Sequence, residues 1–144
     1  MKIPDLNVLI GAFRADAVGH AELREWLRST LRDGETLGLT PAVSTGVVRV
    51  LTNSRVYNAA DTVADALGHI DALRSNPSVI DVGPGPRHWD IFSRLCREAD
   101  ARGNLVADAA HAAIAIEHGA TWITLDRDFA RFSGLRWEVP RVPR

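Results

Sequence analysis

Residues 103–129 read GNLVADAAHAAIAIEHGATWITLDRDF, and this stretch decides the fold. Small and apolar side chains recur in its first part at helical spacing, which predicts a helix that starts at Asn104 or Asp108. Gly119 follows this helix, where a left-handed residue commonly ends a helical run. The uncharged run at 122–125 then predicts a short strand that is buried on both faces, as strands of a parallel sheet are.

Acidic residues directly follow two of the expected strands. Asp126 comes after the strand at 122–125, and Asp5 comes after a strand candidate at 2–4. Because ligands of open α/β sheets gather outside the carboxyl ends of the strands, we expect both acids and Asp108 to converge there. Two carboxylates about 5 Å apart repel by roughly 3 kcal/mol at an effective dielectric near 20. A hard divalent cation, Mg²⁺ or Mn²⁺, is the expected partner of such a cluster at neutral pH.

Each of these acids also has a purely structural interpretation. Asp108 can be a first-turn acid that complements the dipole of its helix. Asp126 and Asp128 can be turn residues, because aspartate readily accepts hydrogen bonds from nearby backbone after a strand. Only the combination of the acids favours a metal site over these interpretations.

The composition limits the class of protein. A chain of 144 residues with 46% hydrophobic and 24% charged residues predicts one globular domain, residues 1–144, with a flexible tail at about 140–144. No apolar run approaches the roughly 20 residues of a membrane span and the first residues lack a secretory signal, so a cytoplasmic location is expected. The net charge of −1 argues against a generally basic surface for nucleic acid but allows local phosphate contacts. Cys96 is the only cysteine, which excludes an internal disulfide and favours a buried filler.

Short strands and helical patterns alternate along the rest of the chain. Strands are expected at 36–39, 79–82 and 136–139, and helices at about 6–13, 20–33, 41–51, 61–74 and 89–101. This alternation predicts a three-layer α/β/α domain on a mainly parallel sheet. Trp89 is expected on the core face of its helix with Phe92 and Leu95, in preference to stacking on a nucleobase.

Three motifs occur in order: PDLNVL at 4–9, NLVADAAHAAIAIEHGA at 104–120 and TLDRDFARF at 124–132. Together they resemble the PIN domain and, within that family, the VapC-type ribonuclease toxins of bacterial toxin–antitoxin pairs. The resemblance covers essentially the whole chain. It implies a Mg²⁺- or Mn²⁺-dependent endoribonuclease that hydrolyses RNA phosphodiester bonds. It further implies a homodimer that is held in check by a small VapB-like antitoxin.

Carried over by position, the resemblance gives the catalytic and metal-binding roles to Asp5, Asp108 and Asp126. We expect three accessory residues as well, which are Asp128, Asn7 and Asn104. Candidates for phosphate contact, each with solvated surface as the alternative, are Arg14, Arg49, Arg127 and Arg131.

Gly46 departs from the family pattern. Many PIN nucleases carry Glu-hydrophobic-hydrophobic-Arg on the helix after the second strand, whereas this chain has Gly46-Val47-Val48-Arg49. The missing acid leaves the number of bound metals open. It also motivates an alternative, a catalytically weakened PIN module that mainly binds RNA or its antitoxin. A phosphatase of small substrates is disfavoured, because Asp5 is followed by Asn7 and not by a second aspartate.

Overall fold

The computed structural model describes residues 1–141 and contains a five-stranded sheet in the order β3-β2-β1-β4-β5. All neighbouring strands are parallel, which confirms the expected α/β class. The strands are β1 (Lys2–Pro4), β2 (Leu37–Leu39), β3 (Val79–Asp81), β4 (Thr121–Ile123) and β5 (Arg136–Glu138). Each strand has three residues, and four of the five were expected to be one residue longer. The strand expected at 122–125 begins one residue earlier and ends at Ile123, so Thr124 and the exposed Leu125 lie beyond it.

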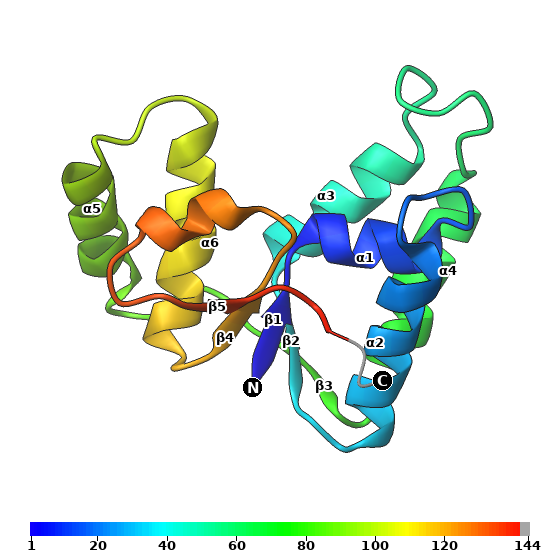
Figure 1. The fold of residues 1–144 in the computed structure, drawn as a ribbon, viewed down its shortest axis with the longest axis horizontal. Coiled ribbons are helices and arrows are strands. Elements are labelled where there is room, and N and C mark those ends of the chain that lie inside the picture. Colours follow the sequence, from blue (N-terminus) through cyan, green and yellow to red (C-terminus); the bar gives the residue numbers. More distant parts are fainter. Residues whose placement is uncertain (142–144) are drawn as a thin grey trace.

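Two sets of helices flank this sheet (Figure 1). The helices are α1 (Leu6–Phe13), α2 (His20–Arg32), α3 (Pro41–Leu51), α4 (Val63–Arg74), α5 (His88–Ala99), α6 (Asn104–Glu117) and the short 3-10 helix η1 (Arg127–Arg131). Helix α1 packs on α2 and α3, α3 packs on α4, and α5 packs on α6. Since parallel crossovers are right-handed, the reversal of strand order between β1 and β4 places the two sets on opposite faces. The β1–β4 boundary is therefore the topological switch point, where ligands of such sheets bind.

Polar side chains start several of these helices. Thr40 Oγ1 accepts a hydrogen bond from the Val43 N–H at 3.1 Å, directly before Pro41 opens α3. Thr62 Oγ1 accepts from the Asp65 N–H at 3.1 Å at the start of α4. Asp5 Oδ1 accepts from the Leu6 N–H at 2.6 Å at the start of α1. Such N-caps satisfy backbone donors that have no partner within the helix.

The connector between β3 and α5 is held by the end of α6. The Glu117 carboxylate accepts hydrogen bonds from the N–H groups of Gly85 at 2.7 Å and Arg87 at 2.8 Å. These bonds hold the pKa of Glu117 below its ordinary value. This connector, GPGPR at residues 83–87, thus binds a carboxylate of the chain itself.

Two details of the helices differ from the expectations. Helix α6 begins at Asn104 and has no acid in its first turn, so the interpretation of Asp108 as a first-turn acid is wrong. Trp89 is 70% exposed, so its placement in the core is also wrong. Burial increases along α5 from Trp89 through the half-buried Phe92 to Leu95, which is fully buried. The neighbouring elements therefore cover only the later turns of this helix.

Three smaller expectations concern residues outside the site. Cys96 is half-buried and not fully buried. Within residues 1–141 no helix combines the length and apolarity that a membrane crossing requires. The expected flexible tail at 140–144 falls mostly on residues 142–144, which lie outside the described residues.

Candidate active site

Pairing of β1 with β4 brings Asp5 and Thr124 together at the carboxyl edge of the sheet. Pro4 is paired with Ile123, and the Asp5 N–H donates to the Ile123 carbonyl at 2.8 Å. One residue further, Thr124 Oγ1 donates to Asp5 Oδ2 at 2.7 Å. Because Asp5 Oδ1 also caps α1, both oxygens of this carboxylate, which is only 6% exposed, are held in place.

Thr124 also organises the turn that carries Asp126. Its hydroxyl oxygen accepts from the Asp126 N–H at 3.0 Å and from Asn7 Nδ2 at 3.5 Å. Asn7 Oδ1 in turn accepts from the Leu125 N–H at 3.3 Å. Asn7 therefore lies among the site residues as a hydrogen-bonding group. Thr124, which sequence reasoning treated only as a strand residue, is the polar group that joins the others.

Burial and neighbouring carboxylates raise the pKa values of Asp5 and Asp108. Burial raises the pKa of Asp5, and the charge of Asp126 raises it further, while the Thr124 hydrogen bond and His111 oppose the shift. Burial is also the largest cause that raises the pKa of Asp108. The charges of Asp126, Asp5 and Asp128, in this order, raise it further. The fold thus brings acids from β1, α6 and the β4–η1 turn into one region of negative potential.

The donor chemistry of this region suits a hard divalent cation. Carboxylate oxygens are the ligands that Mg²⁺ and Mn²⁺ prefer, and a cation would relieve the mutual repulsion of the acids. Within residues 1–141, however, no three His, Cys, Asp or Glu side chains converge tightly enough to hold an ion as they stand. Asp5 is fixed by its hydrogen bonds, so metal binding requires Asp108 and Asp126 to adjust toward it.

The accessory acids and amides lie around this cluster. Asp126 Oδ1 accepts from the Asp128 N–H at 2.9 Å and caps η1, so Asp126 is also a turn residue, as the structural interpretation holds. Asp128 is exposed on η1. Asn104 is the first residue of α6 and is exposed one turn before Asp108.

Arg14 is not a solvated surface residue. It is 9% exposed, and its guanidinium contacts Asp16 at 2.7 Å and Asp61 at 3.3 Å. It also lies over the Tyr57 ring, 3.8 Å from the centroid. These partners already satisfy the guanidinium, which argues against a phosphate contact.

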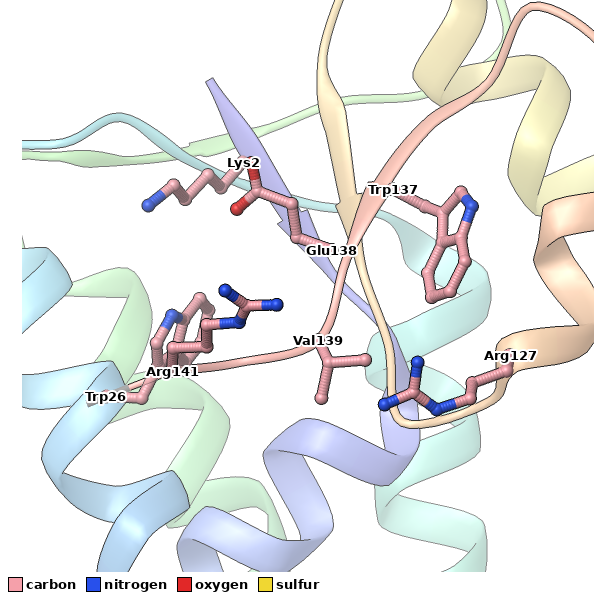
Figure 2. Close-up of a pocket in the computed structure, with 7 residues that line it drawn as sticks. All are labelled: Lys2, Trp26, Arg127, Trp137, Glu138, Val139 and Arg141. Carbon is pink, nitrogen blue, oxygen red and sulfur yellow. The ribbon is translucent and has the colours of Figure 1, made fainter. Parts of the chain in front are cut away.

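The other three arginines are exposed at different places. Arg131 lies beside Asp128, with its Nη2 at 4.0 Å from Asp128 Oδ1. Arg127 borders a cavity of about 500 Å³, into which the guanidinium groups of Arg127 and Arg141 extend from opposite sides (Figure 2). None of the predicted acids lines that cavity, whose other lining residues are Lys2, Trp26, Trp137, Glu138 and Val139.

Arg49 lies on a groove that includes Asp108, one of the three predicted acids. This groove, which we call the α3–α6 groove, has a volume of about 600 Å³ and is lined by Leu6, Pro41, Ala42, Thr45, Gly46, Arg49, Asn104, Ala107, Asp108 and His111. His111 stacks on Trp122 with ring centroids 5.2 Å apart. Burial lowers the pKa of His111, and the Asp5 charge opposes this shift. Sequence reasoning missed His111; its only signal was a polar side chain in the Ala-rich part of α6.

Comparisons with known proteins show the family of this chain. The family model described as PIN domain matches residues 2–135. The chain is 46% identical over 136 residues to "VapC ribonuclease Mb2897" of Mycobacterium bovis, which covers 94% of this chain and 92% of that protein. It is 38% identical over 142 residues to "Ribonuclease VapC25" of Mycobacterium tuberculosis, which covers 99% of this chain and 100% of that protein.

Solved structures share the fold at low sequence identity. VapBC2 from Rickettsia felis, bound to a DNA fragment from their promoter, superposes with a TM-score of 0.70 at 18% identity, covering 96% of this chain and 97% of that one. VapC20 of Mycobacterium tuberculosis, described as a Sarcin-Ricin loop cleaving toxin, gives a TM-score of 0.64 at 17% identity, covering 94% and 99%. At these identities the likeness concerns the fold alone.

Proposed function

The chain belongs to the PIN-domain family, as a ribonuclease toxin of the VapC type, and from this premise we propose that Asp5, Asp108 and Asp126 hold a divalent cation for RNA hydrolysis. The observation that carries the proposal is that the Thr124 hydroxyl joins Asp5 to the Asp126 turn at the switch point of the sheet, and the charges of Asp5 and Asp126 both act on Asp108. Oxygen ligands at this position favour Mg²⁺ or Mn²⁺. The reaction is hydrolysis of a phosphodiester bond within an RNA strand.

Each side chain has a distinct task in this proposal. When bound, the cation supplies a water nucleophile at neutral pH and offsets charge on the phosphoryl oxygens. Asp5 provides a rigid ligand, because the Leu6 N–H and the Thr124 hydroxyl fix both of its oxygens. Asp108 and Asp126 complete the charge that attracts the cation. No side chain acts as a nucleophile.

Residues around these ligands position them and the substrate. Thr124 and Asn7 fix the turn that carries Asp126, which is a typical role of groups behind a metal ligand. Asp128 adds negative charge close to Asp108. Arg49 and Arg131 are exposed near the acids and can contact RNA phosphates.

Two protein partners complete the proposal. VapBC2, whose fold this chain shares, is a toxin–antitoxin complex. We infer that a small VapB-like antitoxin binds this chain and covers its acids. We also infer a homodimer, as in the family that the chain resembles, and Trp89, which is exposed on α5, offers apolar surface that a second copy can cover.

Gly46 favours one alternative, a PIN module that binds RNA or antitoxin but cuts poorly. It lines the α3–α6 groove beside Asp108, where it contributes no ligand atom from a side chain. Calorimetry with Mn²⁺ separates the two functions. A nuclease should bind Mn²⁺ in its physiological range, whereas a module with an incompetent site should not.

The direct test is cleavage of total cellular RNA by the purified toxin with Mg²⁺ or Mn²⁺. We expect cleavage to stop in EDTA and to return when the metal is added back. Cys96→Ser is the control variant, because Cys96 is half-buried on α5 and lines none of the site. Persistent cleavage in EDTA would show a metal-free mechanism and remove the acids from the reaction.

A further inference from the structure

Residues of α3 and α6, which belong to the two opposite helix sets in Figure 1, line the α3–α6 groove. Leu6, the first residue of α1, also lines the groove. The volume of about 600 Å³ falls within the range of roughly 300–1,000 Å³ found for small-molecule sites. Asp108 lines the groove, so the groove is continuous with the acid site.

Gly46 leaves room in this groove. A Cβ atom built at Gly46 has one close neighbour, Leu6 Cδ2 at 3.3 Å. Both residues line the groove, so a longer side chain at position 46 would extend into it. The family pattern has a glutamate here, and its absence therefore removes a side chain from the floor of the groove as well as an acid.

The remaining lining has the character of a nucleotide site. Ala42, Ala107 and Leu6 offer apolar surface against which a base can pack. Arg49 has no ion pair within the described part of the chain. His111 has no hydrogen-bond partner there either, and its ring is fixed by stacking on Trp122.

We propose that the α3–α6 groove holds one nucleotide of the RNA, adjacent to the phosphodiester bond that is cut, and that Gly46 provides the space for it. Arg49 contacts the phosphate of that nucleotide, and the His111 ring offers a hydrogen bond to its base or ribose. This inference rests on the proposed function, because it takes Asp108 as part of the cleavage site. It assigns Gly46 to substrate binding and not to loss of activity.

The probes are the four nucleoside 5′-monophosphates, titrated into the toxin while amide signals are followed by NMR. With Mg²⁺ present, at least one nucleotide should cause saturable shifts at groove residues, Thr45, Gly46, Ala107 and His111 among them. Without Mg²⁺ the shifts should weaken strongly, because the carboxylates at Asp108 repel a phosphate.

Two matched glycine variants test the space itself. Gly46→Leu fills the floor of the groove, whereas Gly68→Leu places the same side chain on α4, where a Cβ meets no atom within 4 Å. Gly46→Leu should weaken nucleotide binding and raise KM for RNA by about tenfold or more, with little change in kcat, as expected when binding that is equal in the ground state and the transition state is lost. Gly68→Leu should change neither. Gly46→Ala, which is easier to accommodate beside Leu6, should give a smaller effect in the same direction.

The outcomes separate this inference from the proposed function. If Gly46→Leu folds, binds nucleotides and cuts RNA like the parent, the groove does not hold the substrate, although metal-dependent cleavage still stands. Shifts confined to the cavity around Arg127, or no saturable shifts with any of the four nucleotides, also overturn the inference. If the parent neither binds Mn²⁺ nor cuts RNA, the proposed function itself fails.

Discussion

Replacing Asp108 by asparagine should raise the stability of the metal-free protein while abolishing most of its cleavage. The change keeps the shape of the side chain and removes one charge from the acid cluster. Among the described residues, no hydrogen bond contributes to the pKa of Asp108, which is shifted by burial and by neighbouring charges. The substitution therefore removes repulsion and sacrifices no hydrogen bond with these residues.

The expected gain follows from Coulomb's law. Two carboxylates about 6 Å apart repel by roughly 1–3 kcal/mol at effective dielectrics of about 40 to 20. Because Asp108 is only half-buried, solvent screening places the net gain near the lower end, at about 1 kcal/mol. A gain of this size corresponds to a rise in melting temperature of about 3–4 °C for a chain of this length.

The pH dependence of this gain has a definite sign. The folded-state pKa of Asp108 lies above its ordinary value of 3.8, so the folded state resists ionisation of this group. Stability therefore falls as the pH rises from the unfolded-state pKa through the folded-state pKa. The advantage of Asp108→Asn should be complete near pH 7 and should disappear toward pH 3.8.

Thermal melts in EDTA, paired with cleavage assays in Mn²⁺, measure both effects. Cleavage should fall by orders of magnitude, because a neutral amide holds a hard cation less well than a carboxylate does. A helix-dipole role for Asp108 predicts the opposite result for both measurements, and the position of Asp108 beyond the first turn of α6 already disfavours it. A lower melting temperature with undiminished cleavage would refute the reasoning.

Three further predictions concern other parts of the chain. Thr124→Val should lower the free energy of unfolding by about 1–3 kcal/mol and impair cleavage, because a buried Asp5 oxygen loses its hydrogen-bond donor. Thr124→Ser, which keeps the hydroxyl, should retain stability and cleavage. A valine variant that melts and cuts RNA like the parent would contradict this role. Glu117→Gln should lower the melting temperature at pH 7 and make the melting temperature depend less on pH in acid. The lowered pKa of Glu117 gives stability that is complete above about pH 4.5 and is lost as the pH falls through the folded-state pKa. A variant whose melting temperature depends on acid pH as the parent's does would contradict this. Sedimentation should show a homodimer at tens of micromolar, and Trp89→Ser should weaken this dimer if α5 lies in the interface. A parent chain that sediments as a monomer at that concentration would exclude the dimer.

The parallel sheet could be predicted because its rules act locally. Short uncharged runs that alternate with helical patterns specify strands and crossovers, and the carboxyl ends of parallel strands must meet at one edge. Asp5 and Asp126 could therefore be placed together before any contact was known. Asp108 was expected at the same edge, although helical periodicity left open where its helix begins, and the family resemblance then implied its metal-binding role.

Other features depend on contacts that periodicity does not encode. Thr124 acquires its role from the register of β1 against β4, because one residue of slip would point its hydroxyl away from Asp5. Trp89 fits the apolar stripe of α5, yet periodicity does not tell how far along the helix its neighbours extend. Arg14 resembled surface arginines, although three groups distant in the sequence surround it, which are Tyr57, Ala59 and Asp61.

The double use of Asp5 bears on how inactive descendants of such toxins can be recognised. Its carboxylate starts α1 and anchors the β4 turn, so folding alone favours aspartate, or the similar helix-capping asparagine, at this position. A descendant that no longer cuts RNA can retain Asp5 because the fold requires its hydrogen bonds. Asp108 makes no hydrogen bond with residues 1–141 that shifts its pKa, so it can be substituted without loss of such a contact. In a genome survey, retention of Asp108 would then be the better marker of a working nuclease.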